Sequence, residues 1–246
     1  MMQNFRLTIA YDGSRYNGWQ RQGNTDDTVQ EKIETVLAGI FGHKIEINGS
    51  GRTDAGTHAL AQVASFKADT EMPPERLMEE INRYLPKDIA VTDVRQAEER
   101  FHARLNAKGK VYLYRIWTEA YPNVFERKYM YELGKKLNTA EMERAALLMC
   151  RNGDYIGYSS LKKSKKSTVR TVHSIGVEDT GREVRLTFRG SGFLYNMVRI
   201  MAGTLVEVGL GKRSAESVIL PFETLDRGDA GETLPAKGLT LVEVAY

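Results

Sequence analysis

The segment Gly49-Ser-Gly-Arg-Thr-Asp-Ala-Gly-Thr-His58 of this 246-residue chain combines three glycines with ionisable side chains between two predicted strands. Its glycines permit positive φ angles and close approach of a ligand to the backbone. Arg52, Asp54 and His58 add the ionisable groups. Taken alone, these residues favour a tight polar turn in which Asp54 accepts hydrogen bonds from local amides. A phosphate site is the next interpretation, weakened because no predicted helix begins directly after the glycines.

Arg199 lies in an apolar run that predicts a helix over residues 194–208. Leu, Met or Val occupies positions 194, 197, 198, 201, 205 and 208, so most of this helix is expected to be buried. A guanidinium there needs a carboxylate partner, because an unpaired buried charge is costly. Alternatively, its head reaches solvent along the aliphatic stem. Asp54 is the candidate partner that would join the two halves of the chain.

A third feature is the aromatic strand predicted over residues 110–117. Tyr112, Tyr114 and Ile116 share one face of it. Aromatic rows of this kind usually belong to a hydrophobic core. On the open face of a sheet they can instead stack on nucleobases.

Two stretches concentrate positive charge, although the net charge of the chain is only +3. The first contains Lys162, Lys163, Lys165, Lys166 and Arg170, and the second contains Arg100, Arg104, Lys108 and Lys110. Such clusters are usually solvated loops. They are weak indications of a polyanionic partner.

Several classes of protein are disfavoured by the sequence. The glycines near Lys212 fail the spacing of a Walker A motif, and Arg213 stands where Ser or Thr is needed. The four histidines have no metal-like spacing, and Cys150 is the single cysteine, so neither a metal site nor a disulfide is expected. No apolar run approaches 18 residues and the N-terminus has no signal core. We therefore expect a cytoplasmic protein without a membrane segment.

Hydrophobic periodicity predicts a similar order of elements in both halves. The first half has strands at 4–11, 44–48, 60–67 and 89–95, with helices at 28–41 and from Pro73 to about 85. The second has strands at 110–117, 171–178, 183–189 and 239–245, with helices at 139–150 and 194–208. Two successive β-α-β-β-α-β units predict an α+β protein with two tandem ferredoxin-like domains and antiparallel sheets. We place them at residues 1–104 and 105–246, with the active-site cleft between them.

The chain resembles the bacterial tRNA pseudouridine synthase A (TruA) family over nearly its whole length. The matching stretches are Tyr11-Asp-Gly-Ser-Arg-Tyr-Asn-Gly-Trp-Gln-Arg21, Val29-Gln-Glu31, Gly51-Arg-Thr-Asp-Ala-Gly-Thr-His58, Phe101-His-Ala-Arg104, Tyr112-Leu-Tyr-Arg115, Gly192-Phe-Leu-Tyr-Asn-Met-Val-Arg199 and Gly203-Thr-Leu205. Departures from the family pattern are Asp154-Tyr-Ile-Gly-Tyr158, where Asp-Phe-x-x-Phe is more common, and Thr240, where an aromatic is common.

The resemblance implies an isomerase that converts uridines 38–40 of the tRNA anticodon stem-loop to pseudouridine without a cofactor. It implies that Asp54 is the catalytic aspartate and that Arg52 helps to turn the nucleotide out of the stem. It also implies that Tyr112 packs on the target uracil, that Arg199 pairs with Asp54, and that the enzyme is a homodimer. We expect Arg21, Lys162 and Lys163 to extend the tRNA-binding surface.

Pseudouridine formation breaks the N1–C1′ bond of the nucleotide and rejoins the base through C5, without redox change or net hydrolysis. A carboxylate can hold the intermediate as a nucleophile at C1′ or C6, or act as a base at C2′. The target base must first leave its stack. The alternative hypothesis is a non-catalytic RNA-binding protein with two RRM-like domains, which leaves the placement of Asp54 among glycines unexplained. Acyl or phosphoryl transfer is disfavoured because no phosphate-binding or metal apparatus accompanies Asp54.

Overall fold

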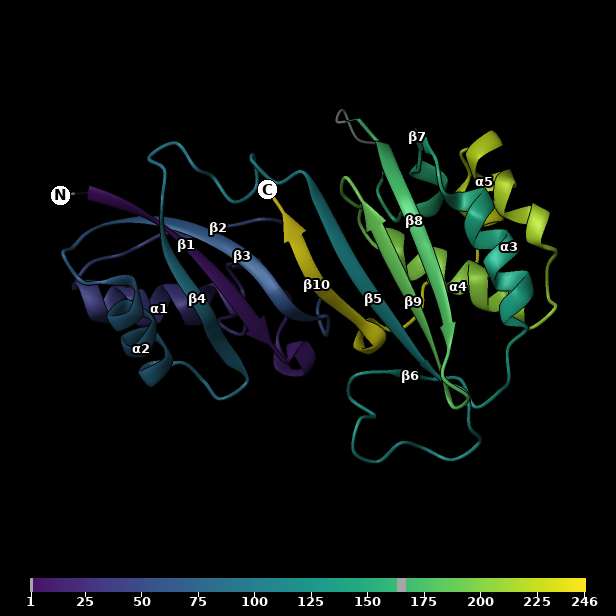
Figure 1. Ribbon diagram of the computed structural model, residues 1–246, viewed down its shortest axis with the longest axis horizontal. Helices are drawn as coiled ribbons and strands as arrows, with labels where there is room; N and C mark the ends of the chain where they lie inside the picture. Colours follow the sequence, from purple (N-terminus) through teal and green to yellow (C-terminus); the bar gives the residue numbers. More distant parts are fainter. Residues whose placement is uncertain (1, 163–166) are drawn as a thin grey trace. The chain divides into compact units, whose positions relative to one another are not determined.

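The computed structural model describes residues 2–162 and 167–246 as a mixed α+β protein whose strands pair mostly antiparallel (Figure 1). The chain divides into two compact units. The first contains Met1–Lys108 and Leu241–Tyr246, and the second contains Gly109–Thr240.

The first unit is an antiparallel sheet with two helices. Its elements are β1 (Met2–Tyr11), α1 (Val29–Phe41), β2 (Asn48–Gly49), β3 (His58–Asp69), α2 (Pro74–Tyr84) and β4 (Ile89–Ala97). β1 lies between β3 and β4, and β2 pairs with β3. The later part of β10 (Leu239–Ala245) is the neighbour of β3 on its other side. The order β-α-β-β-α-β matches the prediction for this half.

The core of the first unit follows from alternation along β1. Phe5, Leu7 and Ile9 are fully buried, whereas Arg6 and Thr8 on the other face are only partly covered. The helices contribute Ile33, Leu37, Leu77 and Ile81, all fully buried. The start and end of α1 are those predicted: the Thr28 hydroxyl accepts the Glu31 amide at 3.3 Å, and Gly42 ends the helix at φ 73°.

The second unit contains mostly antiparallel strands of the sheet, together with helices. Its strands are β5 (Gly109–Trp117), β6 (Tyr131–Glu132), β7 (Asn152–Asp154), β8 (Val169–Asp179) and β9 (Glu183–Gly190). β9 lies between β5 and β8, β7 pairs with β8, and β6 runs parallel to β5. The helices are α3 (Thr139–Met149), α4 (Met197–Gly209) and the short α5 (Leu220–Glu223). Figure 1 shows α3, α4 and α5 gathered beside this sheet.

Two predicted elements differ from the structure. The strand expected at 44–48 forms a ladder only at Asn48 and Gly49, because Ile45 and Ile47 are buried by packing without strand pairing. The helix expected from 194 begins at Met197, because Asn196 adopts a left-handed conformation with φ 60°. The short strands β6 and β7 were not predicted, since two or three residues carry no measurable alternation.

Candidate functional site

The loop that carries Asp54 connects β2 to β3 in the first unit. Asp54 is half-buried, and its carbonyl accepts the amide of Thr57 at 3.1 Å, which closes a tight turn. Gly56 within this turn has φ 78°. A tight turn is therefore present at Asp54, as expected. Its backbone hydrogen bond fixes the main chain that carries the Asp54 carboxylate.

A second segment, residues 11–21, wraps around this loop. The Trp19 amide donates to the Thr53 carbonyl at 3.1 Å, and the Gly56 amide donates to the Tyr16 carbonyl at 3.3 Å. Gly18 has φ 87°, and a Cβ there would lie 2.6 Å from the Thr53 carbonyl oxygen. Side chains larger than hydrogen are therefore excluded where the two segments touch. The resemblance motif Tyr11–Arg21 thus forms the support of the Asp54 loop.

His58 is a structural member of this support. It is 3% exposed, and its Nδ1 accepts the Gly13 amide at 3.0 Å. The Asp12 carboxylate lies 3.2 Å from the same Nδ1 and accepts the Ser14 amide. Within the described part of the chain, no group of three or more His, Cys, Asp or Glu side chains is arranged to hold a metal ion.

The two arginines predicted near the loop have different surroundings. Arg52 is exposed, and its Nε donates to the Gln20 side chain at 3.1 Å. Arg21 forms ion pairs with Glu31 at 3.1 Å and Glu34 at 3.0 Å. The hydrogen bond that Arg21 donates to Glu34, and then the negative charges of both glutamates, raise the pKa of Arg21. The positive charge of Arg21 is therefore balanced locally, whereas Arg52 projects from the loop beside Asp54.

Tyr112 belongs to β5 in the second unit. It is 7% exposed, and its ring meets Phe193 edge-on, with centroids 5.4 Å apart. Tyr114 and Ile116, which share its face, are fully buried, so this row forms part of a core, as aromatic rows usually do. Stacking of a base on Tyr112 requires movement of the side chains that cover it.

Arg199 lies on the first turn of α4, within a helix whose other side chains are almost all buried. Its Nε donates to the Leu234 carbonyl at 2.6 Å and its Nη1 to the Asn196 side chain at 2.9 Å. Burial raises the pKa of Tyr114, and the charge of Arg199 opposes that rise. The Leu234 carbonyl and the Asn196 side chain, both neutral acceptors of its own unit, thus orient the half-buried guanidinium.

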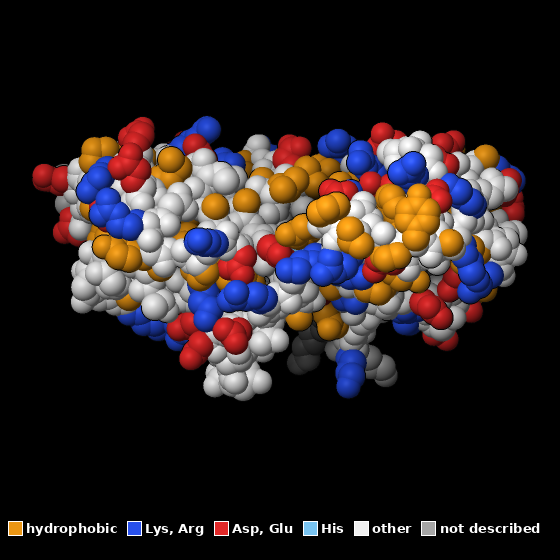
Figure 2. Space-filling model, turned by 90° about the horizontal axis from the view of Figure 1, so that it is seen from below, with side chains coloured by type: hydrophobic (Ala, Val, Ile, Leu, Met, Phe, Trp, Pro, Cys, Tyr) orange, Lys and Arg blue, Asp and Glu red, His pale blue; other side chains and the backbone are white. Residues whose placement is uncertain are grey.

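The basic stretches are only partly described. Lys162 is exposed, whereas Lys163, Lys165 and Lys166 lie outside the described residues. Desolvation lowers the pKa of Arg170, whose Nη1 donates to the carbonyls of Ser167 and Val169. In the second stretch Arg100, Arg104 and Lys108 are exposed. On the face seen in Figure 2, basic and acidic side chains are interspersed with apolar ones.

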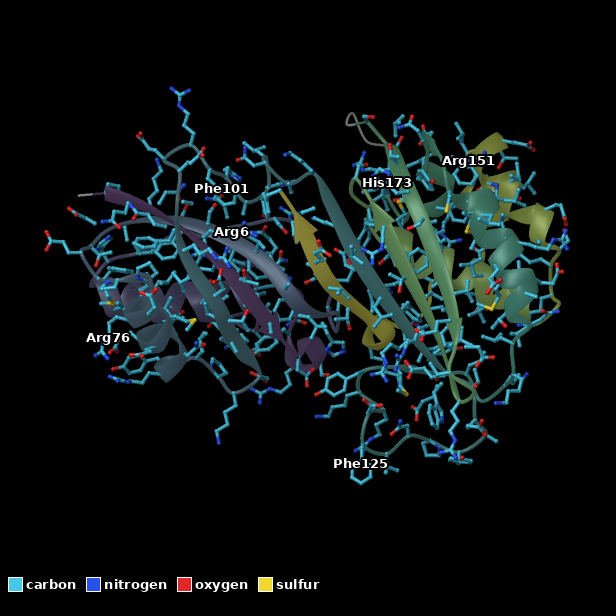
Figure 3. The ribbon with its side chains drawn as sticks, viewed as in Figure 1. Arg6, Arg76, Phe101, Phe125, Arg151 and His173 are labelled. Carbon is cyan, nitrogen blue, oxygen red and sulfur yellow. The ribbon has the colours of Figure 1, made fainter. Side chains whose placement is uncertain are left out.

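The motif Phe101-His-Ala-Arg104 is fixed by an aromatic cluster. The guanidinium carbon of Arg6 lies 4.5 Å from the Tyr246 ring centroid and 5.9 Å from that of Phe101. Figure 3 shows Arg6 and Phe101 next to each other. The Tyr246 hydroxyl donates to the Ala103 carbonyl at 2.7 Å. This cluster ties the end of the chain to the turn that presents Arg104.

The departures at positions 155 and 158 have a structural explanation. Both tyrosines are fully buried, and Phe222 packs against each ring. The Tyr155 hydroxyl donates to the Met149 carbonyl at 2.7 Å, and the Tyr158 hydroxyl to the Val218 carbonyl at 2.6 Å. Their hydroxyls therefore satisfy backbone acceptors inside the second unit. Thr240 is also buried.

Two residues of the site were given no role from the sequence: Tyr11 and Gln62. The Tyr11 hydroxyl lies 2.8 Å from the Thr53 hydroxyl, and Gln62 is fully buried beneath the loop. The available signal was an amide inside the apolar strand Leu60–Lys67, at a position whose neighbours in the sheet belong to the core. A buried side-chain amide must be hydrogen-bonded, so a glutamine at a core position of a strand indicates a polar contact there.

Comparisons with known proteins show which family this chain belongs to. A family model described as tRNA pseudouridine synthase matches residues 7–106 and 153–246. Curated relatives include tRNA pseudouridine synthase A of Bacillus sp. (strain KSM-64), 49% identical over 245 residues, and tRNA pseudouridine synthase A 2 of Bacillus anthracis, 44% identical. That of Acetivibrio thermocellus is 42% identical. Each match covers 100% of this chain and of the relative. Among the described residues, no helix combines the length and apolar character needed to cross a bilayer.

Proposed function

We propose that this chain, which belongs to the tRNA pseudouridine synthase family, isomerises uridine to pseudouridine in transfer RNA. The observation that carries the proposal is the end-to-end match to relatives of that name, since the family model spans both the Asp54 loop and the Arg199 helix. The alternative of a non-catalytic RNA-binding protein is not favoured, because nothing in it calls for a carboxylate on a supported loop.

Asp54 is the proposed catalytic residue, supported by its half-buried position on a loop that a second segment fixes. Its carboxylate attacks C1′ or C6 of the nucleotide, or removes a proton from C2′, while the N1–C1′ bond breaks. The base then rejoins C1′ through C5, and in this process the carboxylate is released from C1′ or C6, or the proton is returned to C2′. C5 loses its proton, and N1 gains one. Arg52, exposed beside Asp54, is proposed to hold the turned-out nucleotide.

The roles proposed for Tyr112 and Arg199 remain predictions, with Tyr112 against the uracil and Arg199 as the counter-ion of Asp54. An adjacent guanidinium would keep the Asp54 carboxylate ionised. Arg21, Lys162 and Lys163 are proposed tRNA contacts, with Arg21 the weakest of them because two glutamates already balance its charge.

We further propose that the targets are uridines 38–40 of the anticodon stem-loop and that the enzyme is a cytoplasmic homodimer. Two tandem ferredoxin-like domains, residues 1–104 and 105–246, are the proposed architecture. The order of elements from β1 to β4 supports it for the first of them.

The test uses tRNA labelled with tritium at C5 of its uridines, incubated with the protein and no cofactor. A synthase releases label in proportion to the pseudouridine formed, and chemical mapping of the product then locates it at positions 38–40. Binding of the tRNA without release of label would contradict the proposal and favour the non-catalytic alternative.

A further inference from the structure

A buried polar network lies beneath the Asp54 loop. Gln62, which is fully buried, donates from Nε2 to the Gly51 carbonyl at 3.1 Å. Its Oε1 accepts the Ser50 hydroxyl at 2.7 Å and the Val63 amide at 3.1 Å. The Ser50 amide in turn donates to the Val63 carbonyl at 2.7 Å. The N-terminal half of the loop is therefore fixed to β3 through the side chain of Gln62.

Thr53, the residue that precedes Asp54, is held at two points. Its hydroxyl lies 2.8 Å from that of Tyr11, and its carbonyl accepts the Trp19 amide at 3.1 Å. Tyr11 and Thr53 are 5% and 7% exposed, so water does not compete for their hydrogen bond. Burial raises the pKa of Tyr11, an effect that hydrogen bonds with Thr53 and Gln62 partly oppose, so its hydroxyl stays neutral at physiological pH.

The turn alone does not require these polar side chains. The Thr57 amide and the Asp54 carbonyl close it with backbone groups, and Trp19 holds Thr53 through its amide. The same face of β1 is otherwise apolar, with Leu7 and Ile9 fully buried. A buried polar group is tolerated only when satisfied, and a satisfied network specifies one conformation of the groups that it joins. Here those groups are Gly51 and Thr53, on either side of Arg52.

We infer that Tyr11 and Gln62 are positioning residues for the isomerisation: through Thr53 and Gly51 they set the place of the Asp54 carboxylate relative to the nucleotide. The inference rests on the proposed role of Asp54. Reacting groups must lie within a few tenths of an ångström of their productive positions, and a misplacement of about 1 Å costs on the order of 100-fold in rate.

The experiment compares Tyr11→Phe, Thr53→Val and Thr53→Ser with the intact enzyme. Thr53→Ser keeps the hydroxyl, whereas Thr53→Val keeps the shape and removes it. Tyr158→Phe is the matched control, because it also removes a fully buried hydroxyl that bonds a backbone carbonyl, in the second unit. Single-turnover rates with saturating enzyme, tRNA dissociation constants and thermal midpoints are measured for each variant.

We expect Tyr11→Phe and Thr53→Val to lower the single-turnover rate by about tenfold or more with tRNA affinity unchanged. Thr53→Ser should restore most of the rate. Tyr158→Phe should lower the thermal midpoint by a similar amount and leave the rate unchanged.

Wild-type rates in Tyr11→Phe and Thr53→Val would overturn the inference, as would equal losses in Thr53→Ser and Thr53→Val. A loss of rate matched by an equal loss of tRNA affinity would also overturn it. Should Tyr11→Phe fail to fold, the two Thr53 variants still decide. Asp54→Asn, measured in parallel, separates the two proposals: if it retains activity, the role of Asp54 fails, whatever the other variants show.

Discussion

The Asp54 loop and the start of α4 each present a charged side chain proposed for the reaction, but the backbone that carries it is supported differently in the two places. The loop has a polar support, in which Gln62, Tyr11 and Thr53 fix the backbone through buried hydrogen bonds. The start of α4 has an apolar support, in which Met197, Val198 and Ile200 bury the helix around Arg199.

The difference matters because hydrogen bonds and apolar packing tolerate change differently. Hydrogen bonds depend steeply on angle and distance, so a polar support specifies one geometry and loses it when one hydroxyl is removed. Apolar packing adjusts to small changes of volume with losses of stability below about 1.5 kcal/mol. Substitutions under the loop should therefore act mainly on rate, whereas substitutions around α4 should act mainly on stability.

Arg199 should give the largest effect in the second unit. Arg199→Ala and Arg199→Met both remove the guanidinium and are expected to lower single-turnover rates by at least about 100-fold, as for loss of an oriented cationic donor. Arg199→Met should unfold at the higher temperature of the two, because it keeps the aliphatic stem. Rates and thermal midpoints test both statements. A wild-type rate in Arg199→Met would limit Arg199 to a structural role.

Gly18 tests how closely the wrapping segment controls the loop. Gly18→Ala introduces a Cβ 2.6 Å from the Thr53 carbonyl at φ 87°, and should cost about 1–3 kcal/mol of unfolding free energy together with part of the rate. Gly181→Ala is the control, since Gly181 has φ 89° and no atom within 4 Å of the added Cβ. It should lose stability through strain alone and keep its rate. Equal rates in the two variants would show that Gly18 does not control the loop.

Buried tyrosines in both units should make the protein sensitive to alkali. Burial raises the pKa of Tyr246 to about 12 from 10.0, and the charge of Arg6 partly opposes this. The unfolded state therefore loses its proton first as pH rises, so the stabilisation is complete below pH 10 and is lost as pH passes through about 12. Denaturant unfolding at increasing pH measures the loss, which Tyr246→Phe should reduce. A denaturant midpoint that stays unchanged from pH 10 to about 12 would contradict the burial of the Tyr246 hydroxyl.

The smallest effect is expected at the exposed Lys162. Lys162→Glu should weaken tRNA binding and lower the slope of log affinity against log salt by about 1 or slightly more, with chemistry on bound tRNA unchanged. Lys135→Glu makes the same charge change at an exposed position outside the segments matched by the family model, and should leave the slope closer to that of the intact enzyme. Identical slopes in all three proteins would remove Lys162 from the RNA interface.

The sequence predicted regular elements well and side-chain partners less well. Periodicity and caps located α1, α3 and the β8–β9 hairpin, because Thr28, Asn138 and Gly181 act through bonds to near neighbours in the chain. Partners distant in sequence left no such signal. The sequence showed neither that Glu31 and Glu34 balance Arg21 nor that Tyr112 meets Phe193 edge-on, since tertiary packing decides both.

The central claim is that Asp54, on its polar support, is indispensable to the reaction. Asp54→Asn keeps the volume of the side chain and removes its charge, so it should fold and bind tRNA nearly as the intact enzyme does, because phosphate contacts dominate affinity. The measurement is release of tritium from C5 under single-turnover conditions with saturating enzyme, which separates chemistry from binding. We predict release at the level of the enzyme-free control. Release at about a tenth of the wild-type rate or faster would contradict the claim.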